Sequence, residues 1–200
     1  NKRDVVDVTR AIRAKSGPVW VFDPQDVANE PPTWWWNPLT YVTNDTQAGK
    51  LAEHFISGSR DPDAKPDAYF DPTSRNLISD LLLAAALGGR PIKEVYRWLT
   101  LNSFLEEAAD ILTEGGYPMH AERVRAIVEM SDKQRDGVLG TAMTNTAALL
   151  NTSIAPWVNP ILNEAGVDER PEFDPHSFVL GSGTLYSLSK EGEGSAGPLV

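Results

Sequence analysis

Two acidic residues follow an apolar β-prone run, at the place where a strand would end. The run Pro18-Val19-Trp20-Val21-Phe22 is continuously apolar, as in buried parallel strands, and Asp23-Pro24 follows it directly. A carboxylate beyond the carboxyl end of such a strand lies where open α/β sheets bind ligands, and Asp26 can face the same crevice. An Asp-Pro pair is equally typical of a turn. Asp23 therefore has two interpretations, a ligand-facing carboxylate and a turn residue.

The other groups that could do chemistry form no recognisable catalytic pattern. The sequence has no cysteine and no G-x-x-x-x-G-K-[ST] phosphate loop. His54, His120 and His176 lie too far apart in sequence for helical pair spacing, which argues against a metal site. Arg135 is interpreted as a solvated or ion-paired arginine. The run 34–36, three adjacent tryptophans, is interpreted as packing rather than a base-stacking platform, because few basic residues interleave it.

Acidic residues dominate the charge of the chain. The formal net charge is −10, and the basic residues are scattered, which opposes binding to a phosphate backbone. An acidic surface of uncompensated carboxylates would instead complement a basic protein partner and speed its association. The alternative is that these carboxylates only keep the protein soluble. The residues predicted to receive a partner are Asp61, Asp63, Glu106, Glu107, Asp110 and Glu114.

The elements that must position these groups are mostly helices. Apolar residues at helical spacing, with glycines as stops, predict an antiparallel helical bundle between short apolar strand segments. The predicted helices cover residues 4–15, 44–58, 72–87, 91–99, 102–114, 119–129, 131–151 and 157–165. The predicted strands cover residues 18–22, 178–180 and 184–188.

Particular residues are expected to stabilise this bundle. In the first helix, the predicted apolar face consists of Val5, Val8, Ala11 and Ile12. Asn102 or Ser103 is predicted to cap the helix that follows, with Glu106 completing a capping box. The predicted core positions are Leu81, Ala85, Leu105, Ile127 and Leu139.

Length and composition fit a soluble piece of a larger protein. Two hundred residues suffice for one domain, or for one domain with part of a second. No apolar run approaches the roughly 20 residues that a membrane helix needs. The chain starts at Asn1 without a signal-peptide pattern and stops at Val200, and both ends look cut. We therefore expect that the chain is part of a larger machine.

Several short motifs occur in an order that resembles a known family. They are Lys2-Arg3-Asp4 with Thr9 and Arg13, Gly17 to Pro24, Trp36-Asn37-Pro38-Leu39, Leu82 to Ala86, Val95 to Leu99, Phe173-Asp174, Phe178-Val179 and Gly183 to Tyr186. Their order resembles the TraG/TraD-type coupling proteins of conjugative type IV secretion, which are ring-forming, DNA-pumping ATPases. The resemblance extends over nearly the whole chain.

The resemblance implies a mainly α fold, a helical bundle with flanking strands. In this family an all-α domain interrupts a RecA-like α/β nucleotide domain, between the phosphate loop and the acidic metal-binding strand. The resemblance makes residues 43–165 the all-α domain, and 1–42 and 166–200 flanking segments of the nucleotide domain. It implies ATP and Mg²⁺ in the parent protein, near Asp23, Asp26 and Arg135, and no complete catalytic site in this chain. The resemblance implies that the parent is a membrane-anchored hexameric ring. This piece would lie on the cytoplasmic side and be monomeric by itself.

Three functions compete at this point. The first is a module that recruits a relaxase or a relaxosome accessory protein to the type IV secretion system. The second is a module that contacts DNA at the pore entrance of the motor. The third is a self-standing enzyme. The acidic charge favours the first over the second, and the missing metal, nucleophile and phosphate-loop patterns count against the third.

Overall fold

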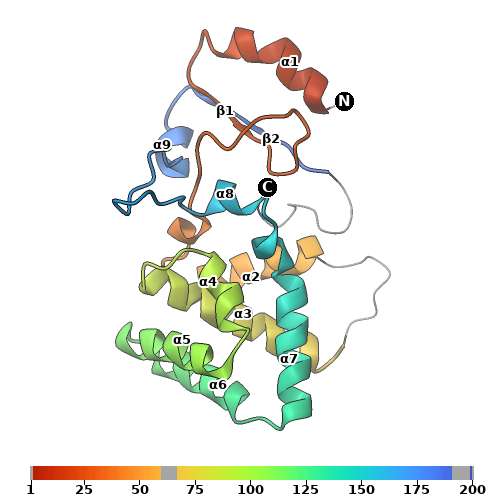
Figure 1. The fold of residues 1–200 in the computed structure, drawn as a ribbon, viewed down its shortest axis with the longest axis vertical. Coiled ribbons are helices and arrows are strands. Elements are labelled where there is room, and N and C mark those ends of the chain that lie inside the picture. The colour runs from red at the N-terminus through yellow and green to blue at the C-terminus, as the bar shows by residue number, and fades with distance from the viewer. Residues whose placement is uncertain (1, 60–66, 191–198, 200) are drawn as a thin grey trace.

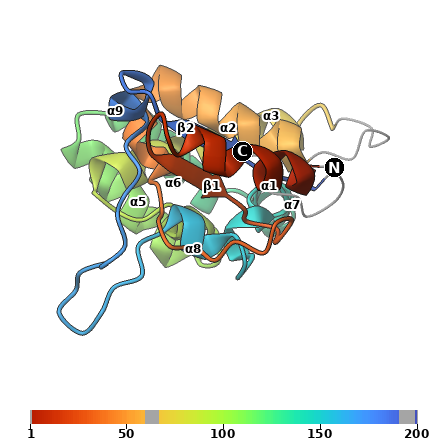
Figure 2. The same cartoon turned by 90° about the horizontal axis from the view of Figure 1, so that it is seen from above.

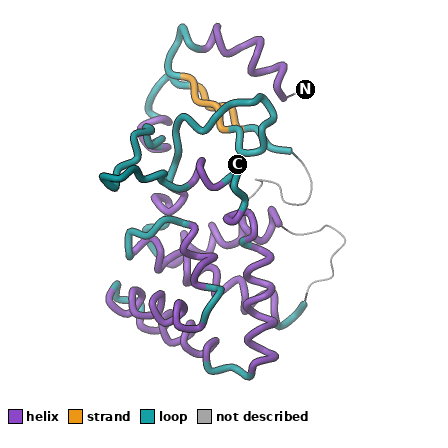
Figure 3. The backbone as a smooth tube through the Cα atoms, in the orientation of Figure 1, coloured by secondary structure: helices purple, strands orange, loops and turns teal. Residues whose placement is uncertain are grey.

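The computed structural model describes residues 2–59, 67–190 and 199. These residues are mainly helical, as predicted, with a pair of short parallel strands at one end and packed helices at the other (Figures 1 and 3). None of the helices described is long and apolar enough to cross a membrane. In chain order the elements are α1 (Lys2–Arg13), β1 (Val19–Phe22), the 3-10 helix η1 (Pro38–Tyr41), α2 (Asp45–Ser59), α3 (Phe70–Leu87), α4 (Lys93–Trp98), α5 (Asn102–Glu114), α6 (Pro118–Val128), α7 (Asp132–Asn145), η2 (Ala147–Leu150), α8 (Ala155–Val158), α9 (Pro175–Val179) and β2 (Thr184–Ser187).

The strands β1 and β2 pair in parallel although the helical body lies between them in the chain. Val19 is opposite Thr184, and Phe22 is opposite Ser187. The predicted strands 18–22 and 184–188 are therefore confirmed. Parallel neighbours need a crossover connection, and here the crossover contains every helix from α2 to α9 (Figure 1).

Helix α1 packs on the strand pair through a face that differs from the predicted one. Val6 is buried against Val21 and Leu188, and the Thr9 hydroxyl lies 2.6 Å from that of Tyr186. A pair of strands is narrow, so it covers only a stripe of the helix. The residues of the predicted face are exposed instead: Val5, Val8, Ala11 and Ile12.

Helix α3 is the centre of the helical body. It packs against α2, α4, α5, α6 and α7, so nearly its whole circumference is covered. Four predicted core positions are buried: Leu81, Ala85, Leu105 and Ile127. Leu139, the fifth predicted core position, is only partly buried and packs at the margin of the core. The residues of α7 that are fully buried in the core are Val138 and Ala142.

Three predicted helix boundaries are corrected. The helix predicted over 157–165 is α8 and stops at Val158, because Asn159 precedes Pro160 and adopts an extended conformation. The helix predicted over 131–151 is α7 followed by the separate turn η2. The capping box at Asn102 or Ser103 is absent, since the residue at the cap position of α5 is Leu101, which makes no side-chain cap.

The predicted strand 178–180 lies at the end of helix α9, with Phe178 and Val179 in the helix and Leu180 at its C-cap. Asp174 caps α9 by accepting a hydrogen bond from the backbone N–H of His176 at 2.9 Å. Pro175 follows at the first helical position, where its missing N–H costs nothing. These start signals override the β-prone apolar run that follows them.

The tryptophan run spans the boundary between the strand pair and the helices. Trp34 is buried, donates its indole N–H to the Val21 carbonyl at 3.1 Å, and meets the ring of Trp157 edge-on. Trp35 and Trp36 are only partly buried. The predicted packing role of the run therefore holds for Trp34, which is part of the main core, and for Trp36, which packs against it.

Candidate functional site

Asp23 has the geometry of a turn residue. Its side chain is buried, and its carboxylate accepts backbone N–H groups from Val27 at 2.7 Å, Ala28 at 2.8 Å and Glu30 at 3.2 Å. Both carboxylate oxygens are thus used to fold the loop after β1. Asp26 lies in this loop, exposed and with a positive φ of 53°. Of the two interpretations, the turn is the one that these contacts support.

Arg135 lies in another part of the molecule. It donates to the carbonyls of Val128 at 3.1 Å and Met130 at 3.3 Å, and to Asp132 at 2.6 Å. These bonds connect the first turn of α7 to the end of α6, and that turn lies at the end of the helical body away from the strands (Figure 1). The ion-paired interpretation of Arg135 is confirmed. The structure does not bring Arg135 together with Asp23 or Asp26, and the proximity of all three to a nucleotide stays a prediction.

The acidic residues of α5 are largely compensated, which corrects the premise of an unpaired acidic surface. Arg97 Nη2 donates to Glu107 at 2.6 Å and lowers the pKa of this carboxyl below its ordinary value. Arg125 contacts both Glu106, at 3.2 Å, and Asp110, at 2.7 Å. The arginines come from the neighbouring helices α4 and α6, so only the tertiary structure could reveal them.

The remaining acidic candidates are not decided by these contacts. Glu114 is exposed at the end of α5 and has no ion pair among the residues described. Asp61 and Asp63 lie outside the described residues. Binding of a partner by the acidic set therefore stays a prediction, although Glu106, Glu107 and Asp110 are already paired with arginines.

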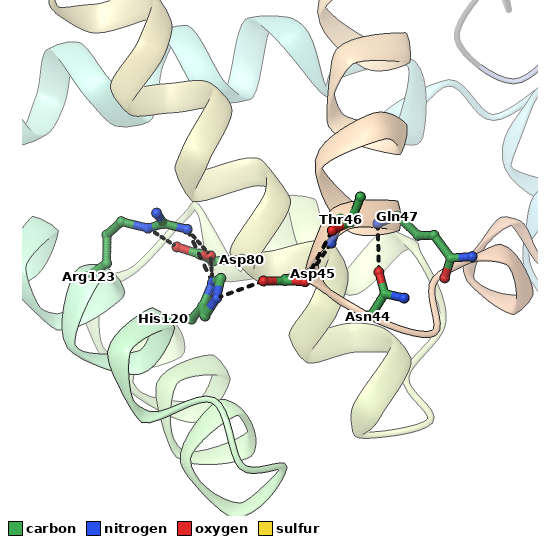
Figure 4. Close-up of polar contacts among 7 residues, drawn as sticks. All are labelled: Asn44, Asp45, Thr46, Gln47, Asp80, His120 and Arg123. Atoms are coloured by element: carbon green, nitrogen blue, oxygen red, sulfur yellow. Dashed lines mark hydrogen bonds and ion pairs between the residues drawn. The ribbon is translucent and has the colours of Figure 1, made fainter.

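The helical body contains a buried ion cluster that the sequence reasoning missed. Asp80, on α3, is fully buried. Arg123, on α6, donates to both of its oxygens, from Nε at 2.7 Å and from Nη2 at 2.6 Å. His120, one turn earlier on α6, lies with Nδ1 2.7 Å from Asp80 Oδ1 (Figure 4). Because a carboxylate only accepts, Nδ1 carries the proton in this contact.

The cluster connects three helices. His120 Nε2 lies 3.7 Å from a carboxylate oxygen of Asp45, in the first turn of α2 (Figure 4). Asn44, before this turn, accepts the backbone N–H of Gln47 at 3.0 Å and caps the helix. The hydrogen bonds to Asp80 raise the pKa of Arg123 above its ordinary value, so the guanidinium stays protonated. The cluster therefore holds α6 and the start of α2 against α3.

The contacts of the cluster decide what chemistry it supports. An Asp–His pair can orient a general base, but a nucleophilic mechanism also needs a hydroxyl or thiol on the other imidazole nitrogen. Among the described residues, the near neighbour of His120 Nε2 is the carboxylate of Asp45 instead. The geometry thus fits a structural ion cluster. One signal could have found it: Asp80 lies three residues after Leu77 and four before Ala84, on the buried face of an apolar helix, where a carboxylate needs a partner.

A cavity of about 520 Å³ lies between the strand pair, η1 and α2. The aromatic residues in its lining are Phe22, Trp34, Trp36, Tyr41, His54 and Phe173. Neither lysine, arginine, aspartate nor glutamate is among the described residues that line it. Such a lining suits an apolar or planar group rather than a phosphate.

Comparison of the chain with models of protein families, with curated proteins and with solved structures finds no match. Among the residues that the structure describes, no group of three or more histidines and carboxylates is placed to hold a metal ion. What the chain does is therefore inferred from its own residues and geometry.

Proposed function

We propose that this chain is the substrate-recruiting module of a conjugative coupling ATPase of the TraG/TraD type. The observation that supports this most is the parallel pairing of β1 and β2, since β1 precedes and β2 follows the helical body in the chain. A chain that leaves a parallel sheet, builds a set of helices and returns to the neighbouring strand has the connectivity of an all-α domain inserted into an α/β domain. The motif order along the sequence agrees with that connectivity.

The strand pair itself fits a sheet that continues in a longer protein. Parallel sheets are normally wider than two strands and covered by helices on both faces. Here α1 lies beside the pair, and its residues Val5, Val8 and Ile12 are more than half exposed. In the proposed parent, further elements of the nucleotide domain would cover these side chains, and ATP with Mg²⁺ would bind to residues outside this chain.

A phosphate-release assay tests whether ATP hydrolysis requires residues of the parent protein that lie outside this chain. Without a phosphate loop and its lysine, the β- and γ-phosphates lack their usual clamp, so we expect no ATP hydrolysis above background from the chain alone. Turnover that a single substitution within these residues abolishes would show an active site of its own.

A binding comparison tests recruitment. The purified chain is titrated with the relaxase encoded on the same mobile element, with labelled single- and double-stranded DNA, and with an unrelated basic protein as control, each at low and moderate salt. We expect saturable relaxase binding, no binding of the control, and DNA affinity that vanishes steeply with salt. DNA binding that persists at physiological salt, without relaxase binding, would establish the DNA-contacting alternative instead.

A further inference from the structure

A groove lined by basic and apolar side chains lies beside the turn between α3 and α4. Its lining includes Trp35, Asn37, Arg90, Lys93, Ile161 and Leu162, and its volume is about 660 Å³. We call it the basic groove. It is separate from the aromatic cavity and from the Asp80 cluster, and none of its lining residues has a part in either.

Two large apolar side chains are exposed along one wall of the basic groove. Ile161 is 53% exposed and Leu162 is 60% exposed. They belong to the connection between α8 and α9, which extends away from the rest of the chain (Figure 2). Adjacent exposed aliphatic side chains beside a concave surface are typical of a site that binds another chain.

The loop that carries these side chains is held in place by several polar contacts, most of them partly buried. Asp168 accepts the backbone N–H of Ile161 at 2.6 Å and is paired with Arg170 at the same distance. Arg170 also donates to the carbonyls of Pro32 at 3.3 Å, Pro156 at 2.6 Å and Asn159 at 3.1 Å. Ile161 and Leu162 are therefore presented by a fixed backbone, so binding a partner need not order the loop.

The charged residues that line the groove are both basic, in a protein whose net charge is −10. Lys93 is exposed, and its ammonium has no ion pair among the residues described. Arg90 is half-exposed and lies 3.5 Å from Glu107, which Arg97 already holds at 2.6 Å. Both cations can therefore pair with carboxylates of a partner. The net negative charge of the protein disfavours the approach of such carboxylates to the rest of its surface.

We propose that the basic groove binds a peptide segment of a partner protein in which acidic residues flank large apolar ones. The apolar side chains would bury Ile161 and Leu162, and the carboxylates would pair with Arg90 and Lys93. A nucleic acid fits less well, because two cations neutralise few phosphates and the net charge opposes the rest of the backbone. This inference does not depend on the coupling-protein proposal.

A displayed library of random short peptides tests the proposal. Peptides are selected on the wild-type chain and then measured against two double variants. Lys93→Glu with Leu162→Ser changes the groove. Lys133→Glu with Leu150→Ser makes the same chemical changes at exposed positions that do not line it.

We expect selected peptides to be rich in Asp or Glu beside Leu, Phe or Trp. We expect them to bind the groove variant at least about tenfold more weakly than wild type, and the control variant like wild type. All four positions are exposed, so we expect both variants to fold. Circular dichroism checks this. The proposal is overturned if no peptide is enriched, if the enriched peptides lack acidic residues, if both variants lose binding equally, or if a single-stranded oligonucleotide displaces the peptides. Relaxase binding is measured separately, so failure of either proposal leaves the other intact.

Discussion

Arg123→Ala should destabilise the protein more than the exchange of an arginine that belongs to an exposed ion pair. Arg123 donates two hydrogen bonds to Asp80, which is fully buried among the helices around α3. Without the guanidinium, the carboxylate keeps His120 as its neighbour but loses both bonds from Arg123. The substitution therefore leaves a buried charge that is only partly compensated.

The magnitude follows from the burial of the pair. Removing one partner of a buried ion pair costs about 3–5 kcal/mol. Since the side chain of Arg123 is itself 44% exposed, water can reach part of the space that it leaves, and the lower end of the range is expected. The double variant Asp80→Leu, Arg123→Ala should recover much of this loss, because it removes the buried charge together with its partner.

Urea unfolding followed by far-ultraviolet circular dichroism measures these free energies. Arg75→Ala is the matched control, since it breaks the exposed pair with Glu53 and should cost less than about 1 kcal/mol. The reasoning is refuted if Arg123→Ala lowers the free energy of unfolding no more than Arg75→Ala. It is also refuted if the double variant is less stable than the single one.

Three further predictions concern the core, the loop after α8 and the turn after β1. Leu81→Ala should lower the free energy of unfolding by about 2–5 kcal/mol in urea titrations, because Leu81 is fully buried; a parent-like midpoint would contradict the packing. Arg170→Ala should cost about 3 kcal/mol, since the side chain of Asp168 is 6% exposed and loses its partner. Arg170 depresses the pKa of Asp168, so this stabilisation is present above about pH 4, the unfolded pKa, and is lost as the pH falls towards the lower folded pKa. The acid-induced fall in the free energy of unfolding should therefore be smaller in the variant, and equal slopes would refute the assignment. Asp23→Asn should cost about 1–3 kcal/mol in thermal or urea unfolding, because an amide nitrogen would face a backbone N–H, whereas Asp26→Asn should be neutral, since asparagine tolerates its positive φ. Equal effects of the two exchanges would favour the ligand-facing interpretation of Asp23.

Local patterns in the sequence were sufficient to predict most of the elements. Apolar spacing of three and four residues, with glycine stops, located α2 to α6 within a few residues. The apolar runs 18–22 and 184–188 were predicted as strands and are β1 and β2. Asp174 and Pro175 are a local helix-start signal, and they start a helix where the apolar run 178–180 by itself indicates a strand.

The sequence by itself thus determined most of the helices and the strands β1 and β2, since helix periodicity, caps and stops act over a few neighbouring residues. Only the tertiary structure decided which faces are buried and which charges meet. Val6 rather than Val5 packs on the strands, because the position of β2 selects the face of α1. Asp80 finds Arg123, and Glu107 finds Arg97, across helices whose contacts no local pattern records. Burial and ion pairing depend on residues distant in the chain, so the electrostatics of this acidic protein became clear only when its helices were packed together.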